Sequence, residues 1–329
     1  MLPRLRSAVL PPWPLHARPV LRAWLCPVLR AWLCPVLALL AGGCGMGVSS
    51  AASGPAPGEL PAVAAENFWG SIAAQLGGGK VAVRSIIVDP NTDPHSYDPT
   101  AADAVTLARA KLAIVNGIGY DRWAAQLLAA DAGSSPVLLN VGELLGLREG
   151  DNPHQWYSPA SVQRVVDRIT GDYERLDPKD AAYFAARRSW FEKRGLARYH
   201  ALITTIRRRF AGVPVGYSES LFRPLGQALG LDLLTPYSFA KAIAEGSEVS
   251  AEDKQTVDAQ VRRHQIKVWV YNSQNATPDV QRVNELARAA HIPIATITET
   301  LAPAADSFEQ WQVAQLTGLL QALHRATGR

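Results

Sequence analysis

Cysteine is missing from most of this chain. The three cysteines among its 329 residues are Cys26, Cys34 and Cys44, and none follows position 44. The rest of the sequence therefore forms no disulfide, offers no thiolate to a metal and provides no cysteine nucleophile. Its chemistry must be carried by other side chains.

Acidic residues are missing from the first 57 positions, which carry five arginines: Arg4, Arg6, Arg18, Arg22 and Arg30. The whole chain has 33 basic and 29 acidic residues, a net charge of +4. Without those five arginines, 28 basic residues stand against 29 acidic ones, so the remainder sits near −1. A nucleic-acid partner, which needs a basic surface, is therefore not expected.

The familiar catalytic signatures are also missing. The sequence contains no HExxH motif, no GxSxG nucleophile elbow and no glycine-rich phosphate loop. Apolar residues nevertheless make up 48 % of the chain, which favours a globular body over a disordered one. The length suits one large domain or two medium ones.

Residues 1–43 have the pattern of an export signal. Arginines come first, an apolar run through 35–40 follows, and Ala41-Gly42-Gly43 precedes Cys44. The apolar run is too short to span a bilayer. Because 41–44 resembles a bacterial lipobox, we expect cleavage before Cys44, lipidation of Cys44 and a flexible tether over 44–59. An ordinary signal peptide cut nearby is the alternative.

Helical and strand patterns alternate from Leu60 onward. We expect helices over 62–76, 101–110, 120–130, 158–176, 222–229, 251–264, from 277 and 308–326, and strands over 81–88, 112–116, 137–141, 213–217, 266–271 and 292–298. This order predicts an α/β fold built from mostly parallel sheets flanked by helices. We place an N-terminal lobe at 60–178 and a C-terminal lobe at 211–329.

A long helical segment separates the two lobes. Residues 180–209 contain no proline and only one glycine, Gly195. Such a length is unusual for a helix inside a single domain. We therefore expect one linker helix over 179–210 that joins the lobes.

Four polar side chains lie beyond predicted strands, two in each lobe: His95, His154, Glu219 and Glu299. In open α/β sheets, ligands bind in the crevice beyond the carboxyl ends of the strands. A cleft between the lobes would bring all four together. Two imidazoles and two carboxylates suit Zn²⁺ or Mn²⁺.

Each of the four also has a simpler interpretation. Either histidine can be an ordinary surface or hydrogen-bonded loop residue. Glu219 can be an acid at a helix N-terminus, where the helix dipole favours it, and Glu299 can be merely solvated. Both histidines follow a proline, which restricts the preceding backbone and helps to fix an irregular loop.

Several distinctive segments cover nearly the whole body: Asn67-Phe68-Trp69, Asp93-Pro94-His95-Ser96-Tyr97-Asp98-Pro99-Thr100, Val115-Asn116-Gly117, Asn152-Pro153-His154-Gln155-Trp156, Ser218-Glu219-Ser220, Trp269-Val270-Tyr271-Asn272 and Thr298-Glu299. Together they resemble one known family, the solute-binding proteins of zinc/manganese ABC importers.

The resemblance implies that His95 and His154 bind the metal, that Glu219 is a third ligand and that Glu299 is a fourth. The family usually has aspartate at the fourth position, so the longer Glu299 is expected to bind bidentately or through water. Zinc-dedicated members often carry a histidine-rich loop between the first two ligands. No histidine occurs over 96–153, so manganese stays open beside zinc.

The expected function is capture of the ion outside the cell and delivery to a membrane permease and its ATPase. We expect a monomer anchored to the outer face of the membrane. The candidates to orient the ligands are Tyr97, Gln155 and Trp156, with simple packing as the equal alternative for all three. A metal-dependent hydrolase is the rival, although four protein ligands would close the site that it needs open. A surface adhesin of the same family is the second rival. We interpret the sequon Asn275-Ala276-Thr277 as chance.

Overall fold

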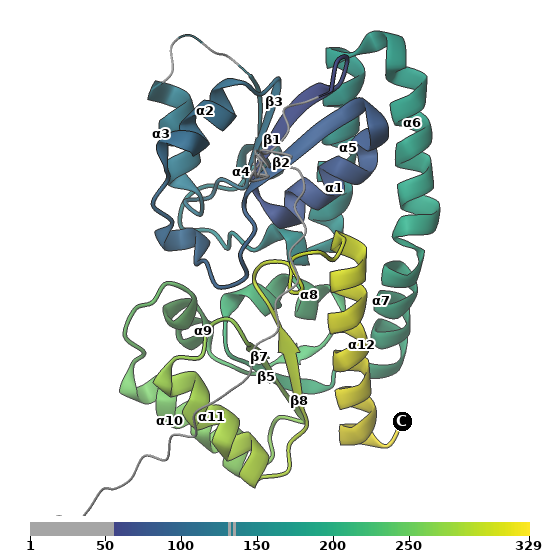
Figure 1. Cartoon of the computed structure of the whole chain (residues 1–329). Coiled ribbons are helices and arrows are strands. Elements are labelled where there is room, and N and C mark those ends of the chain that lie inside the picture. The colour runs from purple at the N-terminus through teal and green to yellow at the C-terminus, as the bar shows by residue number, and fades with distance from the viewer. Residues whose placement is uncertain (1–55, 131–132, 134–135) are drawn as a thin grey trace, which may run out of the picture. The chain divides into compact units, whose positions relative to one another are not determined.

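The computed structural model describes residues 56–130, 133 and 136–329. The predicted signal segment and Cys44 lie outside these residues. The described chain contains two four-stranded sheets in which every strand pairing is parallel (Figure 1). The predicted α/β fold with two lobes is thereby confirmed.

The N-terminal sheet has the order β2-β1-β3-β4. Its strands are β1 (Leu60–Glu66), β2 (Val81–Ile87), β3 (Leu112–Val115) and β4 (Val137–Asn140). Helices α1 (Asn67–Gly77), α2 (Ala101–Ala108), α3 (Arg122–Ala130), α4 (Val141–Leu145) and α5 (Pro159–Leu176) accompany them. The short α4 was not predicted.

The C-terminal sheet repeats the arrangement with the order β6-β5-β7-β8. Its strands are β5 (Pro214–Tyr217), β6 (Asp232–Leu233), β7 (Val268–Asn272) and β8 (Ile294–Ile297). The accompanying helices are α8 (Arg223–Ala228), α9 (Tyr237–Ala244), α10 (Ala251–Arg262), α11 (Pro278–Ala289) and α12 (Phe308–Thr327). Neither β6 nor α9 was predicted.

The prediction of a helix over 62–76 is wrong in its first third. Leu60–Glu66 is the strand β1, and the helix α1 starts only at Asn67. Between β2 and β3, β1 is buried on both faces, so it shows no alternation of apolar and polar residues. Residues 62–65 are three alanines and one valine, and the high helix propensity of alanine favours a helix there when the sequence is considered alone.

The predicted single linker helix is interrupted. Helix α6 (Ala181–Trp190) and helix α7 (Ala197–Phe210) flank a π-helical turn at Phe191–Gly195. The N–H of Leu196 donates to the carbonyl of Phe191 over 2.8 Å, and a Cβ at Gly195 would lie 2.9 Å from Phe191 Cδ2. Glycine therefore permits the wider turn, a type of irregularity often found at functional positions.

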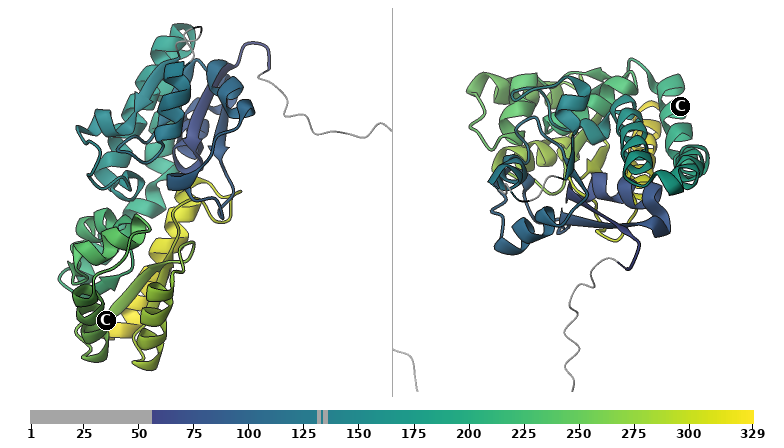
Figure 2. Two further views of the ribbon diagram at one scale, coloured as in Figure 1. Left: turned by 90° about the vertical axis from the view of Figure 1, so that its left-hand side faces the viewer. Right: turned by 90° about the horizontal axis from the view of Figure 1, so that it is seen from above.

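The two lobes share apolar packing. Phe184 of α6, Tyr199 of α7 and Trp311 of α12 belong to one buried cluster that includes residues of both sheets. Figures 1 and 2 show α12 beside α7, so a second helix reinforces the connection. Because packed interiors resist compression, this shared core favours small adjustments between the lobes over large ones. Within the described part of the chain, no helix combines the length and apolarity that crossing a membrane needs.

Candidate metal centre

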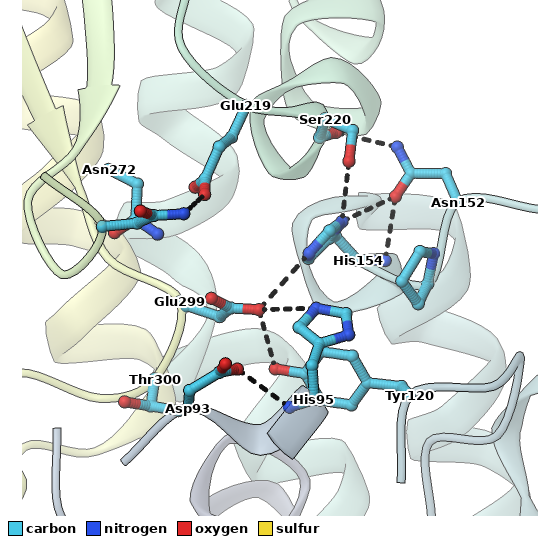
Figure 3. Close-up of polar contacts among 12 residues, drawn as sticks. Asp93, His95, Tyr120, Asn152, His154, Glu219, Ser220, Asn272, Glu299 and Thr300 are labelled. Carbon is cyan, nitrogen blue, oxygen red and sulfur yellow. Dashed lines mark hydrogen bonds and ion pairs between the residues drawn. The ribbon is translucent and has the colours of Figure 1, made fainter. Parts of the chain in front are cut away.

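Two imidazoles and one carboxylate converge between the lobes (Figure 3). The Nε2 atoms of His95 and His154 each lie 3.4 Å from Oε1 of Glu299. Potential ligand atoms of these three residues all fall within 4.8 Å of one another. Ligands about 2.1 Å from a tetrahedral ion lie about 3.4 Å apart, so both nitrogen-to-oxygen distances match the spacing of a transition-metal site.

His95 sits in the short 3₁₀ turn Pro94–Ser96 that follows β2. Asp93 caps this turn, since its Oδ1 accepts from the backbone N–H of His95 over 2.9 Å. The imidazole packs edge-on against Tyr120, with ring centroids 4.6 Å apart. Its side chain stays 27 % exposed, whereas that of His154 is 1 % exposed. An incoming ion would therefore meet His95 first.

His154 is oriented by the side-chain amide of Asn152. Oδ1 of Asn152 accepts from the backbone N–H of His154 over 3.0 Å and lies 2.8 Å from its Nδ1. An amide oxygen only accepts hydrogen bonds, so Nδ1 carries the proton and Nε2 presents its lone pair toward Glu299. Outer partners of this kind fix the tautomer of metal-binding histidines.

The side chain of Asn116 holds the loop that carries His154 in place through a hydrogen bond to the residue before it. This buried side chain accepts from Trp69 Nε1 over 3.0 Å and donates to the carbonyl of Pro153 over 3.0 Å. The next residue, Gly117, has φ +70°, and a Cβ there would lie 2.1 Å from Oδ1 of Asn140. These contacts explain why the segment 115–117 needs asparagine followed by glycine.

Glu299 lies at the centre of the site. Its Oε1 accepts from the Tyr120 hydroxyl over 3.1 Å as well as facing both imidazoles. Its backbone N–H donates to Oε1 of Gln274 over 2.7 Å. Burial alone would raise the pKa of this carboxyl. When the imidazoles of His154 and His95 are protonated at low pH, their hydrogen bonds and charges hold the pKa well below its ordinary value.

The two histidines differ in their affinity for protons. Burial lowers the pKa of His95, but the hydrogen bond and charge of Glu299 outweigh it and raise the pKa above 6.5. For His154 burial prevails, and its pKa falls below 6.5 despite Glu299. A metal ligand must be deprotonated, so a proton competes with the metal more strongly at His95 than at His154.

Glu219 stands apart from the other three predicted residues. Its carboxylate accepts a hydrogen bond from Asn275 Nδ2, while its second oxygen, Oε2, is buried without a hydrogen-bond partner among the described residues (Figure 3). Burial and the charge of Glu299 raise the pKa of Glu219 to about 8. It is therefore a mostly protonated acid near neutral pH, within electrostatic reach of the other ligands.

Two hollows reach the site, and His95 lines both. The larger, about 450 Å³, is bordered by Tyr97, Tyr120, Asn152 and Lys241 among others. The smaller, about 390 Å³, is bordered by Asp93, Gln274 and Glu299 among others. Solvent and ions can therefore approach the imidazole of His95 from two sides.

Two of the three predicted orienting residues do something else. Tyr97 donates to Asp103 over 2.9 Å and packs on Trp123, so it supports its own loop. Trp156 stacks on Phe68 with ring centroids 3.9 Å apart and forms a buried wall behind His154.

Gln155 does touch the orienting network. Its Nε2 donates to the backbone carbonyl of Asn152 over 2.8 Å. The contacts of Tyr120, Asn152, Gln274 and Asn275 were missed from the sequence. The sequence offers a signal only for Asn152, because it belongs to the motif Asn152-Pro153-His154. Our interpretation of Asn275 as part of a chance sequon did not anticipate its contact with Glu219.

Comparison with known protein families gives one extended match. The family model described as zinc-uptake complex component A, periplasmic (ZnuA) matches residues 62–322 of this chain. The manganese-binding lipoprotein MntA of Halalkalibacterium halodurans is 28 % identical over 205 residues, which are 60 % of this chain and 66 % of MntA. That is just under two thirds of the relative. The zinc-binding protein TroA of Treponema pallidum is 21 % identical over 214 residues, 62 % of this chain and 67 % of TroA.

Solved structures show the same fold. The periplasmic zinc-binding protein TroA of Treponema pallidum aligns with a TM-score of 0.65 and 19 % identity, covering 82 % of this chain and 99 % of TroA. A manganese-bound S38A mutant of a periplasmic metal-binding protein from candidatus liberibacter asiaticus aligns with a TM-score of 0.67 and 19 % identity, covering 80 % of this chain and all of that one (100 %).

Proposed function

Because this chain belongs to the family of the periplasmic zinc-uptake component ZnuA, we propose that it captures a divalent transition-metal ion between its lobes for import. The observation that carries the proposal is the convergence of two Nε2 atoms on one carboxylate oxygen, each at 3.4 Å from it. Such a ligand set suits zinc and accepts manganese. Family membership favours this role over the hydrolase, and the relatives described above are named for metal binding, which favours it over the adhesin.

In the proposed site, His95, His154 and Glu299 bind the ion directly. Glu219 completes the set when its carboxyl loses its proton and turns from Asn275 toward the ion. The shared apolar core limits the accompanying lobe movement to a small tightening. The ion is cargo, so the site has to release it again on an importer.

Metal titration of the purified protein tests the proposal. We expect Zn²⁺ or Mn²⁺ to bind with one ion per chain in calorimetry and to raise the unfolding temperature. An ion at 100 times its dissociation constant stabilises the folded state by about 2.7 kcal/mol. Competition between the two ions identifies the cargo. No heat of binding and no thermal shift with either ion would reject the capture role.

Delivery is proposed to occur at the membrane. In this proposal the protein is a monomer held to the outer face by a lipid on Cys44, and it passes the ion to an ABC permease with its ATPase. MntA, one of the relatives, is described as a lipoprotein. We expect Cys44→Ala to move the protein from the membrane fraction to the soluble fraction. Equal membrane retention of both proteins would contradict lipidation at this residue.

A further inference from the structure

The amide of Asn152 touches both lobes at once. Its Oδ1 faces the backbone N–H and Nδ1 of His154, at 3.0 and 2.8 Å. Its Nδ2 donates to the backbone carbonyl of Ser220 over 2.8 Å (Figure 3). One side chain thus connects a predicted metal ligand of the N-terminal lobe to the main chain of the C-terminal lobe.

The neighbours permit only one orientation of this amide. A backbone N–H only donates and a backbone carbonyl only accepts, so the oxygen of Asn152 must face His154 and its nitrogen must face Ser220. The contact with Ser220 therefore holds the oxygen in the position that keeps the proton on Nδ1 of His154. The lone pair on Nε2 depends in turn on a contact between the lobes.

Ser220 belongs to the C-terminal side of the proposed site. It directly follows Glu219 and opens the 3₁₀ turn Ser220–Phe222. Its hydroxyl also lies 3.4 Å from Nδ1 of His154, a longer and weaker contact than that of Asn152. Movement of this segment away from the N-terminal lobe would break both contacts at Ser220.

The segment around Glu299 is attached differently. Three hydrogen bonds tie it to α1 and to the His154 loop: Tyr157 Oη to Thr298 O at 2.7 Å, Leu301 N to Asn67 Oδ1 at 3.2 Å, and Phe308 N to Ser71 Oγ at 2.8 Å. These hydrogen bonds hold the Glu299 segment against the N-terminal lobe without any contribution from Asn152. The contact of Asn152 with Ser220 instead links the N-terminal lobe to the segment that carries Glu219.

We infer that Asn152 is a positioning residue that couples the tautomer of His154 to contact between the lobes, so that separation at Ser220 weakens the hold on the ion. This inference rests on the proposed function. When the lobes separate at Ser220, the amide loses the partner of its Nδ2 and keeps only the backbone N–H of His154, so the acceptor that keeps Nε2 unprotonated is held less firmly. Release of the ion is thereby linked to opening of the cleft.

Two substitutions separate the two contacts. Asn152→Asp keeps an acceptor for both N–H groups of His154 but cannot donate to the carbonyl of Ser220. Asn152→Ala removes both contacts. We expect Zn²⁺-loaded Asn152→Asp to release its ion to excess EDTA about 10-fold faster than the wild type, and Asn152→Ala to bind Zn²⁺ about 10- to 100-fold more weakly.

The direction of the aspartate result is diagnostic. An added negative charge beside the cation would by itself slow its loss, so faster release from Asn152→Asp has to come from the broken contact between the lobes. ¹⁵N NMR of the metal-free proteins reports the tautomer: Nδ1–H in the wild type and Asn152→Asp, and a mixture with Nε2–H in Asn152→Ala. A residue with a purely structural role would not produce this split.

The matched control is Gln75→Ala. The amide of Gln75 donates to Glu309 Oε2 over 2.7 Å, joining α1 to α12 away from the site, so its loss should leave zinc release and the His154 tautomer unchanged. Thermal unfolding without metal verifies that each variant folds. Failure of the wild type to bind zinc would reject the proposed function, whereas wild-type zinc release by Asn152→Asp or an unchanged tautomer in Asn152→Ala would reject only this inference.

Discussion

Replacing His154 by alanine is expected to weaken metal binding at least about 100-fold, because even residues that only support a metal ligand contribute 10- to 100-fold. His154 is buried, its tautomer is fixed by Asn152, and its pKa lies below the ordinary value, so it is the histidine best prepared for an ion. At an ion concentration that stabilises the wild type by about 2.7 kcal/mol, a 100-fold weaker variant would retain about 0.4 kcal/mol. Calorimetric titration and thermal unfolding with Zn²⁺ measure both effects.

Replacing a histidine outside the site by alanine gives the control for this prediction. His200 on α7 pairs only loosely with Glu192, at 3.9 Å, and lies outside the site. His200→Ala should bind zinc as the wild type does. Equal affinities of His154→Ala and His200→Ala would remove His154 from the ligand set, and with it the geometry on which the proposed function rests.

Acidification is expected to expel the bound ion. Below their pKa values His95 and Glu219 hold protons that compete with the metal, so affinity is highest above those pKa values and falls as the pH drops through them. The pKa of His95 is raised above 6.5. Between pH 6.5 and pH 5, His95 alone should lower the affinity by at most about 30-fold, because one competing proton costs no more than 10-fold per pH unit. Zinc titrations at pH 8, 6.5 and 5 measure this loss.

Proton release shows whether Glu219 joins the ligand set. Its pKa is raised to about 8 by burial and by Glu299, so at pH 7 it has to lose a proton before it can bind an ion. Calorimetry in buffers of different ionisation enthalpy should therefore find about one proton fewer released by Glu219→Gln than by the wild type. Identical proton release by the two proteins would show that Glu219 keeps its proton and stays bonded to Asn275.

The position of the candidate ligands could be predicted because it depends on local pattern. Strands such as Leu112–Val115 and Pro214–Tyr217 are short apolar runs, and polar residues after them fall at the carboxyl edge of a parallel sheet. That rule accounts for Glu299 after β8 and for His95 in the loop after β2, whereas the helix α4 separates His154 from β4. The rule carried no information on how far apart Glu219 and Glu299 lie, since a side-chain direction is set by packing that the pattern does not contain.

The strand β1 shows where local pattern fails. Residues 62–65, AVAA, suit a helix by propensity, and the structure makes them the strand between β2 and β3. A strand buried on both faces needs small or apolar side chains throughout, so it lacks the alternation that identifies a strand with one solvent face. Only its pairing with two neighbours defines it.

The sequence by itself determined the absence of thiol chemistry beyond Cys44, the two α/β lobes and the two Pro-His loops, because composition and periodicity are local properties. Only the tertiary structure decided that Asn152 sets the tautomer of His154, that Asn275 holds Glu219, and that the linker helix is broken at Phe191–Gly195. These features depend on side-chain orientations and a turn geometry that packing fixes and that a local pattern does not contain. A contact such as Asn152 to Ser220 exists only once two segments 68 residues apart are brought together.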